Sequence, residues 1–596
     1  MIEKIFSSER SMRKLIADVL VVGGGTGGTA AAIQAARRGA KTILVSEFSW
    51  LGGMLTSAGV TAPDGNELAA FQTGLWGAFL RELEQRQPDG LDHAWVSFFT
   101  YEARIGAEIF ADWVKALPNL EWIQGEIPEK VLRERESILS VEFQSVKIEA
   151  KITIDATELG DLLELGNIPY RWGWELQSEF NELSAPIEHN ELTRTYPVQA
   201  PTWVVVLRDF GNAIAPEIPK PPNYDPTKFE QAWTKYGAEA FLNYGRLPGN
   251  RFMINWPISG NDYGEGVDRL LNLKTRAQFH QEAKDYSLGF AHFIQSQLGT
   301  RYGLAEDTFP IGAIALHPYY RESRRLIGIT TVREQDLLPK GRVAPLPFRV
   351  EAIGCEYAKN FCQSIAIGNY ANDHHYPSGD IPLKPKSTRW GGRWTGTPFT
   401  IPYSSLVPRT IDNFLVCEKN ISVTHMANGA TRLQPVVLGI GQAAGMAAAL
   451  CIEQNCQPRD LDVRSLQLAL VTDAIAPAAI FPLYNLSPSH PEWQHWQRYY
   501  INHPESYPNS GECPAKSWIQ PPSKAAQPFS GIFERKAVQE YTLRSIDDSQ
   551  QIWSIVTVEA AIDAQLQKIQ SGQLLSGLGK YNRSGNWILV EALSAE

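Results

Sequence analysis

The chain of 596 residues contains little cysteine, six residues in all, and no pair with the spacing Cys-x-x-Cys. So few thiols at irregular positions exclude a disulfide framework, and the missing pair argues against a thioredoxin-like redox motif or a structural zinc site. We therefore expect buried or unreactive thiols in a reducing compartment. The six residues are Cys355, Cys362, Cys417, Cys451, Cys456 and Cys513.

The chain also lacks an excess of basic residues and a long apolar run. Lysine and arginine number 55 against 65 aspartate and glutamate, so the formal charge is −10, which argues against nucleic acid or an anionic membrane as a partner. No stretch approaches the ~20 apolar residues of a membrane span, and the N-terminal residues show no signal-peptide cleavage pattern. We expect a cytoplasmic protein whose partners are a small-molecule substrate and an unidentified electron acceptor, in an oligomeric state that stays open.

The most informative motif present is a glycine-rich turn near the N-terminus. A short apolar run precedes Gly23-x-Gly25-x-x-Gly28, and an alanine-rich segment follows it. Gly23 permits a tight turn, Gly25 lets the backbone approach a pyrophosphate, and Gly28 lets the following helix pack closely on the strand. The N–H groups of the first helical turn, which includes Thr26 and Gly27, then face the phosphate charge. The pattern predicts a dinucleotide-binding βαβ unit.

The residues after this turn extend the prediction. A β-branched run closes at Glu47, about 20 residues after the last glycine, where a carboxylate can accept hydrogen bonds from ribose hydroxyls and would repel a 2′-phosphate. The glycine motif alone does not separate FAD from NAD. The loop Gly52-Gly53-Met54 favours FAD, because paired glycines at this place let the backbone run beside an extended dinucleotide, as in flavoproteins. An ordinary glycine loop is the alternative interpretation.

The order of segments predicts an α/β protein with a discontinuous, Rossmann-like FAD-binding domain on a mostly parallel sheet. A stretch after residue 124 alternates like an antiparallel meander, and its last segment, ITIDA, is apolar enough to join the buried parallel sheet. A proline-rich stretch then indicates an inserted α+β substrate domain before a late strand, Phe414–Cys417. The predicted units are 1–172, the first part of the FAD-binding domain; 173–400, the inserted substrate domain; 401–460, the last part of the FAD-binding domain; and 461–596, a C-terminal extension of unknown role.

A second glycine-rich stretch follows the late strand. We expect a helix over Gly439–Cys451 made almost entirely of small residues, which would allow close approach of a flat ligand or of another backbone. A helix N-terminus aimed at a flavin would stabilise negative charge on the ring. Gly441, Gln442 and Ala443 would then contact the cofactor. The alternative is a tightly packed core helix, which alanine-rich segments commonly form.

Four separated segments together resemble the FAD-dependent oxidoreductase family of the glutathione-reductase-like structural class, in a poorly characterised bacterial branch. They are Val21–Val60, Ile154–Gly173, Tyr320–Gly328 with Ile365–His375, and Ile401–Leu450. The resemblance implies that Thr157 and Asp161, in the turn DATELGD, lie near the cofactor. It further implies an extended FAD and a two-electron reaction at the flavin, but no particular substrate.

Three residues are candidates for chemistry at a flavin, where oxidation of an alcohol or amine needs a base for the heteroatom proton. His425 would lie in a loop close to the ring, and Arg432 in the same loop could bind an anionic substrate group. His375 follows Asp373 and His374, so a carboxylate beside paired imidazoles could orient it as a base. Hydrogen bonding that only holds the loop is the alternative for His425 and Arg432. We expect no metal, because HxH and HExxH motifs are missing.

These features predict an FAD-dependent oxidoreductase that transfers a hydride between a small organic substrate and the flavin. The missing cysteine pair argues against a disulfide reductase. An NAD-dependent dehydrogenase and a non-catalytic, flavin-binding electron carrier are the alternative functions. The charged cluster between Arg321 and Arg325 is expected to form structural ion pairs, with one arginine that could face the substrate.

Overall fold

A computed structural model of the protein describes residues 12–348, 361–377, 379, 381–385, 387–546 and 550–594. Cys355 lies outside these residues, and the other five cysteines are free thiols.

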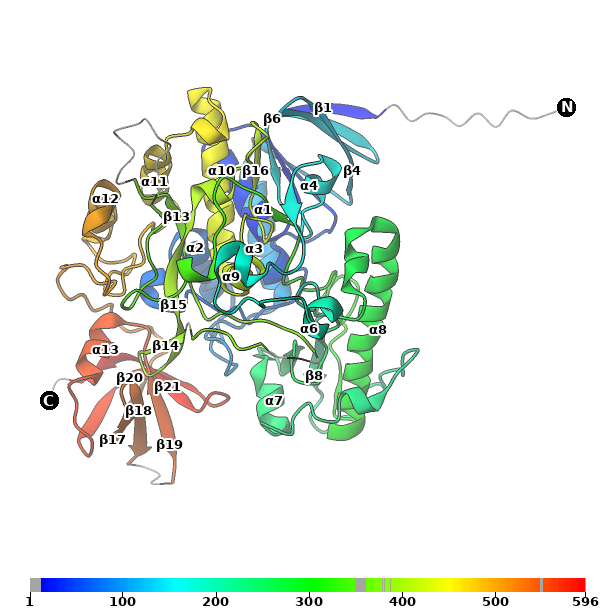
Figure 1. The fold of residues 1–596 in the computed structure, drawn as a ribbon. Coiled ribbons are helices and arrows are strands. Elements are labelled where there is room, and N and C mark those ends of the chain that lie inside the picture. The colour runs from blue at the N-terminus through cyan, green and yellow to red at the C-terminus, as the bar shows by residue number, and fades with distance from the viewer. Residues whose placement is uncertain are drawn as a thin grey trace.

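The largest sheet has the strand order β3-β2-β1-β6-β5-β4, and β16 pairs with the last residues of β6 (Figure 1). Strands β1, β2, β3, β6 and β16 run parallel, while β4 and β5 form an antiparallel hairpin beside the first half of β6. The mostly parallel, Rossmann-like sheet is therefore confirmed, together with the meander that precedes ITIDA. The strands are β1 (Arg13–Val22), β2 (Thr42–Ser46), β3 (Leu120–Gln124), β4 (Pro128–Glu134), β5 (Ser137–Phe143), β6 (Val146–Asp155) and β16 (Phe414–Val416).

Between β6 and β16 the chain forms smaller sheets and a long helix, α8 (Leu273–Leu298). One sheet has the order β11-β8-β10-β9, a second has the order β13-β15-β14, and β7 pairs with β12. The strands are β7 (Tyr170–Arg171), β8 (Val205–Asp209), β9 (Arg246–Leu247), β10 (Arg251–Ile254), β11 (Tyr302–Leu304), β12 (Arg325–Leu326), β13 (Ser364–Tyr370), β14 (Ser387–Trp390) and β15 (Arg393–Pro402). The shorter helices of this part are α4 (Asp161–Leu165), α5 (Gln177–Phe180), α6 (Glu191–Thr195) and α7 (Ala238–Tyr244), and α9 (His425–Thr431) follows β16.

The last residues form a closed barrel with the strand order β17-β18-β19-β21-β20. The third and fifth strands pair in parallel, and α13 connects the third to the fourth. This is the topology of the oligonucleotide- and oligosaccharide-binding fold, although a fold alone assigns no ligand. The elements are β17 (Gln527–Ala537), β18 (Glu540–Ser545), β19 (Ile552–Val556), α13 (Ala560–Leu566), β20 (Leu574–Asn582) and β21 (Trp587–Leu593).

The barrel is attached to the rest of the protein at the β14–β15 turn. The backbone N–H of Thr557 donates to Gly391 O at 2.8 Å, and an added Cβ at Gly391 would lie 2.1 Å from Thr557 O. Trp587 of β21 packs edge-on against Phe98.

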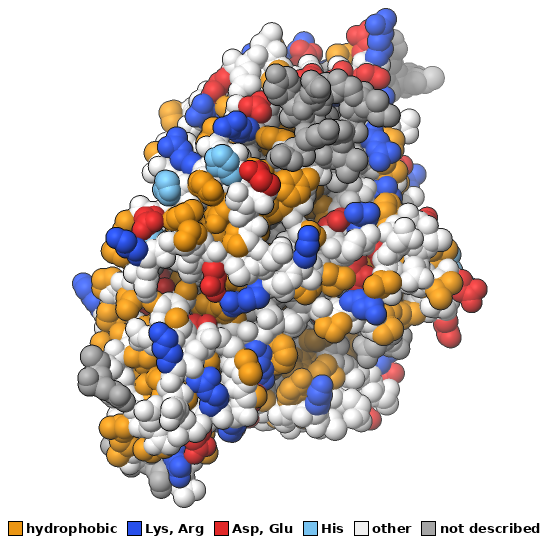
Figure 2. Space-filling view, turned by 60° about the vertical axis from the view of Figure 1, so that its left-hand side comes forward, with side chains coloured by type: hydrophobic (Ala, Val, Ile, Leu, Met, Phe, Trp, Pro, Cys, Tyr) orange, Lys and Arg blue, Asp and Glu red, His pale blue; other side chains and the backbone are white. Residues whose placement is uncertain are grey.

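On the face in Figure 2, lysine and arginine side chains are spread singly among acidic and hydrophobic ones.

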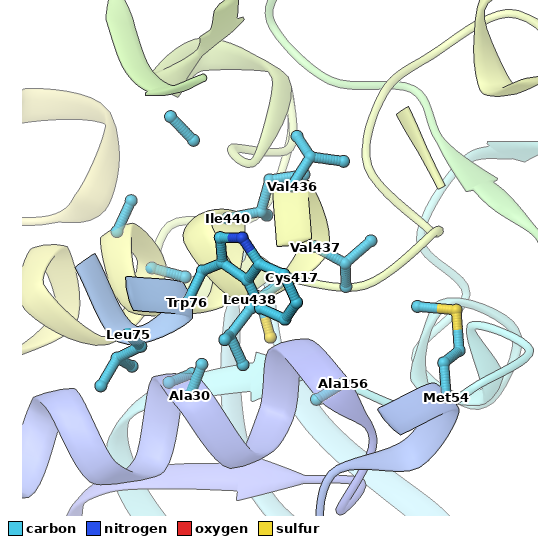
Figure 3. Close-up of a cluster of buried hydrophobic side chains, with 14 of the residues drawn as sticks. Ala30, Met54, Leu75, Trp76, Ala156, Cys417, Val436, Val437, Leu438 and Ile440 are labelled. Carbon is cyan, nitrogen blue, oxygen red and sulfur yellow. The ribbon is translucent and has the colours of Figure 1, made fainter. Parts of the chain in front are cut away.

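Two helices of small residues, α1 (Thr26–Arg37) and α10 (Gln434–Gln454), pack along each other. An added Cβ at Gly445 would lie 2.1 Å from Ala31 O, so only a residue without a side chain permits this approach. Figure 3 shows Ala30 of α1, Leu438 of α10 and Cys417, the residue just after β16, in one buried cluster. The remaining helices are α2 (Gly74–Arg86), α3 (Ala103–Lys115), α11 (Val463–Val471) and α12 (Trp493–Asn502).

The predicted boundary of α10 is wrong. The helix begins at Gln434, five residues before Gly439, because Pro435 is compatible with a first turn. The expectation that no stretch approaches the apolar length of a membrane span is also wrong: among the described residues α10 is the one helix long and apolar enough to cross a membrane by length and composition. In the structure, 89% of that apolar window is buried inside the protein.

Candidate functional site

The predicted glycine turn connects β1 to α1 and is wedged between the ends of two other strands. Gly23 has a φ of +115°, and an added Cβ there would lie 2.0 Å from Ala156 O, just after β6. An added Cβ at Gly27 would lie 1.8 Å from Cys417 O, just after β16. Gly23 is therefore needed for its backbone conformation and its close packing, and Gly27, in the first turn of α1, for close packing.

A cavity of about 230 Å³ opens beside this turn. It brings together five of the predicted cofactor residues, which are Gly23, Gly25, Glu47, Thr157 and Asp161. The carboxyl ends of β1, β2 and β6 meet here, as expected for neighbouring parallel strands.

The other residues predicted from the N-terminal motifs support the wall behind the cavity. The hydroxyl of Thr26 donates to Gly52 O at 2.8 Å, which ties the paired-glycine loop to α1. An added Cβ at Gly53 would lie 2.7 Å from Thr26 N, and Met54 is buried. Gly28 faces Gly23 O at 2.0 Å from its hypothetical Cβ, so it permits the close packing of α1 on the turn.

Three charged residues that were not predicted from the sequence, Glu158, Glu418 and Lys419, lie beside the glycine turn. Lys419 Nζ lies 2.6 Å from Glu158 Oε2 and 3.3 Å from Glu418 Oε2. The N–H of Gly27 donates to Glu418 Oε1 at 2.5 Å. Burial raises the pKa of Glu418 to about 7. Their positions directly after predicted strand ends were the signal that could have found them.

These residues fit an extended dinucleotide. The cavity runs from the glycine turn before α1 to Glu47 at the end of β2. A helix N-terminus favours an anion, and at α1 the Gly27 N–H already donates to the Glu418 carboxylate. Glu158 Oε1 is buried without a hydrogen-bond partner in the described chain, so it is available to accept from a hydroxyl.

Helix α8, from the part of the chain between β6 and β16, covers one side of the cavity. Leu273, Arg276 and His280 line it, and Arg276 binds both carboxylate oxygens of Asp161 at 2.7 and 2.9 Å. Although burial raises it, the pKa of Asp161 is held below its usual value by Arg276 and by Arg324. Burial and the charge of Arg276 lower the pKa of His280 to about 4.

Gly441, Gln442 and Ala443, which were predicted to contact the cofactor, are not among the residues that line this cavity. An added Cβ at Gly441 would lie 2.1 Å from Gly27 O, and Ala443 is buried in the core. The Gln442 amide accepts from Leu75 N at 2.9 Å. These residues serve the α1–α10 contact, so the alternative interpretation of a tightly packed core helix holds for them.

His425 is fully buried and begins α9, whereas the sequence analysis expected a loop. Its Nδ1 lies 2.9 Å from Glu322 Oε1, and its Nε2 lies 2.6 Å from the hydroxyl of Tyr376. The ring of Trp174 lies on it, with centroids 4.0 Å apart. Both nitrogens are thus engaged with protein groups. The same tyrosine hydroxyl contacts His374 Nδ1 at 2.9 Å.

His375 and Arg432 meet in a second network through Asp373. His375 Nε2 lies 2.9 Å from Asp373 Oδ2, and Arg432 donates to the same oxygen at 3.0 Å. His375 Nδ1 lies 2.7 Å from Asp262 Oδ2, a buried partner that the sequence analysis missed. Arg432 also donates to the hydroxyl of Tyr319. Although burial raises it, the pKa of Asp373 is held well below its usual value by His375 and Arg432.

The charged cluster between residues 321 and 325 is buried and forms ion pairs. Arg325 lies 2.7 Å from Glu175 and 3.0 Å from Glu322, while Arg324 lies 3.0 Å from Asp161. Arg321 lies 3.1 Å from Asp262 and so supports the carboxylate that holds His375.

A family model described as FAD dependent oxidoreductase matches residues 18–470. Among solved structures, a geranylgeranyl bacteriochlorophyll reductase-like protein of Thermoplasma acidophilum is 11% identical over 74% of this chain and 80% of its own, with a TM-score of 0.30. GidA of Aquifex aeolicus is 19% identical over 23% of this chain and 24% of its own (TM-score 0.17). Thioredoxin reductase of T. acidophilum is 19% identical over 28% and 40% (TM-score 0.16). No curated protein matches the chain.

Proposed function

The chain belongs to the FAD-dependent oxidoreductase family, and from this premise we propose that it transfers a hydride between a small organic substrate and the flavin. An unidentified electron acceptor completes the cycle. The family favours an enzyme with FAD over an NAD-dependent dehydrogenase or a non-catalytic electron carrier. The observation that carries the proposal is the network of Asp262, His375, Asp373 and Arg432, which joins a histidine to a carboxylate with 38% of its side chain exposed.

The cavity beside α1 supplies the residues that would hold the cofactor. When bound, FAD supplies a two-electron acceptor at its ring. The backbone of Gly23 and Gly25, with the N-terminus of α1, would receive the pyrophosphate. Glu47 would accept hydrogen bonds from the ribose, and Glu158 Oε1 from a further hydroxyl.

We propose that His375 transfers the proton to or from the substrate. Each of its ring nitrogens lies within hydrogen-bond distance of a carboxylate, Asp262 at 2.7 Å and Asp373 at 2.9 Å, which fixes the orientation of the ring. Nε2 would give a proton to the substrate heteroatom in the reducing direction and take one in the oxidising direction, while Asp262 holds Nδ1. His375 is a better candidate than His425, because 12% of its side chain is exposed and that of His425 is fully buried.

Arg432 would orient the substrate. Its guanidinium is buried, and its Nε has no hydrogen-bond partner in the described chain. A planar cation with an unused donor suits an anionic or carbonyl oxygen. Since Asp373 already binds this arginine and His375 together, a substrate held at Arg432 would lie within reach of the His375 ring.

The proposal is tested by anaerobic bleaching of the FAD-loaded protein against hydroxy acids, amines and sugars. We expect one of these classes to bleach the flavin. His375→Gln should slow bleaching by about 10²- to 10⁴-fold with the flavin still bound. The matched control is His93→Gln, a half-buried histidine that contacts Gly90 O, and it should bleach at the wild-type rate. Equal rates for both variants would remove His375 from the reaction.

A further inference from the structure

A second cavity, of about 280 Å³, lies between α8 and the segment of chain that precedes α7. The early segment contributes Pro222, Asn223, Tyr224, Asp225, Lys228 and Phe229, and the later chain contributes Tyr263, Glu265, Glu282, Asp285, Tyr286 and Gly289. It shares no lining residue with the cavity beside α1. Its floor is buried at Phe229 and Gly289, and its rim is exposed at Asp225, Lys228 and Glu265.

The lining carries four carboxylates against one ammonium. Glu265 is paired with Lys228 at 2.7 Å, and Glu282 is paired with Arg269. Asp285 and Asp225 are different, because the hydrogen bonds they accept come from neutral donors. Asp285 accepts from the side chain of Gln281 at 2.9 Å, and Asp225 from the backbone and hydroxyl of Thr227. Negative charge therefore remains at the rim to attract a cation.

The rest of the wall is aromatic and already receives ammonium groups of the chain itself. Lys228 Nζ lies 5.6 Å from the ring centroid of Tyr286, and Lys220 Nζ lies 5.2 Å from that of Tyr224. Tyr263 and Tyr286 are tilted against each other with centroids 5.3 Å apart. Aromatic faces next to carboxylates are the surroundings in which organic ammonium ions bind, through the ring quadrupole and the charge.

A mid-helix glycine keeps the floor of this cavity open. Gly289 lies in the interior of α8, where glycine is unfavourable relative to alanine. An added Cβ would lie 3.3 Å from Tyr224 and 3.8 Å from Phe229. Glycine lowers the helix propensity of α8 at this position, and a larger residue would crowd the aromatic side chains that line the cavity.

From these contacts we infer that the cavity between Tyr224, Tyr263, Asp285 and Tyr286 binds a small organic ammonium ion. The ammonium would face Asp285 and the ring of Tyr286, and its alkyl groups would lie against Phe229 and Gly289. Lys228 occupies part of the same place and acts as an internal competitor. The inference does not depend on the redox reaction at the first cavity.

The test is calorimetric titration of the full-length, FAD-loaded protein with choline and with its uncharged carbon analogue, 3,3-dimethylbutan-1-ol. We expect choline to bind at one site at least about tenfold more tightly than the analogue. Asp285→Asn should weaken choline binding about tenfold, because it removes a charge and keeps the shape. Lys228→Gln should strengthen binding several-fold, because it removes the competing ammonium.

The control is Glu230→Gln, which removes a nearby exposed charge that does not line the cavity, and its affinity for choline should equal that of the wild type. Three results would each overturn the inference. One is a neutral analogue that binds as well as choline. Another is an Asp285→Asn variant that behaves like the control. The third is the lack of choline binding in both the wild type and Lys228→Gln.

Discussion

The glycine turn at the start of α1 and the network around His375 are built in opposite ways. The turn uses backbone from a few consecutive residues, and its contacts with Ala156 and Cys417 leave no room for side chains. The network uses side chains from separate segments between Asp262 and Arg432, held by mutual charge. The glycine turn should therefore be destabilised by an added side-chain atom, and the His375 network by the removal of a charge.

The largest effect is expected in the buried ion pairs of residues 321–325, a cluster that meets the His375 network where Arg321 pairs with Asp262. Arg325 is fully buried and pairs with Glu175 and Glu322, so Arg325→Met would remove the closest guanidinium from two buried carboxylates. The free energy of unfolding should fall by about 3–5 kcal/mol, measured by urea unfolding. The control is Arg333→Met, whose pair with Asp336 is exposed on both sides, and it should lose less than about 1 kcal/mol. Equal losses would show that burial does not govern this network.

The backbone-built turn should fail by overpacking. Gly27→Ala adds a Cβ 1.8 Å from Cys417 O, which we expect to cost about 1–3 kcal/mol and to lower flavin affinity about tenfold or more. Flavin fluorescence on titration with FAD measures the affinity. Gly439→Ala on α10 is the control, since its Cβ would meet Ala366 at 3.4 Å, an ordinary contact. A Gly27→Ala protein with wild-type flavin affinity would contradict the packing argument.

The smallest expected effect concerns pH and the end of β6, the strand whose following residue, Ala156, contacts the glycine turn. Burial raises the pKa of Asp155, at the end of β6, to about 7. The folded state then binds more protons than the unfolded state between about pH 4 and pH 7, so this group makes stability fall as pH rises through that window. The contribution reaches at most about 1.4 kcal/mol per pH unit.

Asp155→Asn should flatten this slope, because an amide does not ionise and Asp155 Oδ2 has no hydrogen-bond partner to lose in the described chain. Apoprotein unfolding measured from pH 4 to pH 8 gives the slope. Asp336→Asn, at an exposed ion pair, should leave it unchanged. A variant with the wild-type slope would show that Asp155 ionises normally in the folded protein.

The candidate site was predictable from sequence to different depths. Gly23, Gly25 and Glu47 could be predicted because each follows a recognisable strand within one βαβ unit. Gly441, Gln442 and Ala443 could not be placed, because small residues suit a ligand and a neighbouring helix equally well. In the structure, α1 packs against the face of α10 that carries Gly441.

The network around His375 was only partly predictable. Its residue types indicated chemistry, but Asp262 was missed, because nothing local marks it as a partner of a residue more than a hundred positions away. The C-terminal barrel was missed for a similar reason. Its closure depends on pairing between β17 and β20, and short amphipathic strands without a motif do not reveal their partners.

By itself the sequence determined the mostly parallel sheet, the glycine turn with its acidic partner on the next strand, and membership of a flavin-dependent family. These depend on local periodicity and on backbone conformations that few residues besides glycine adopt. Only the tertiary structure decided that His375, not His425, has a route to solvent, that α8 covers the first cavity, and that a separate aromatic and acidic cavity exists. Burial and charge pairing arise between distant segments, so no single stretch of the chain encodes them.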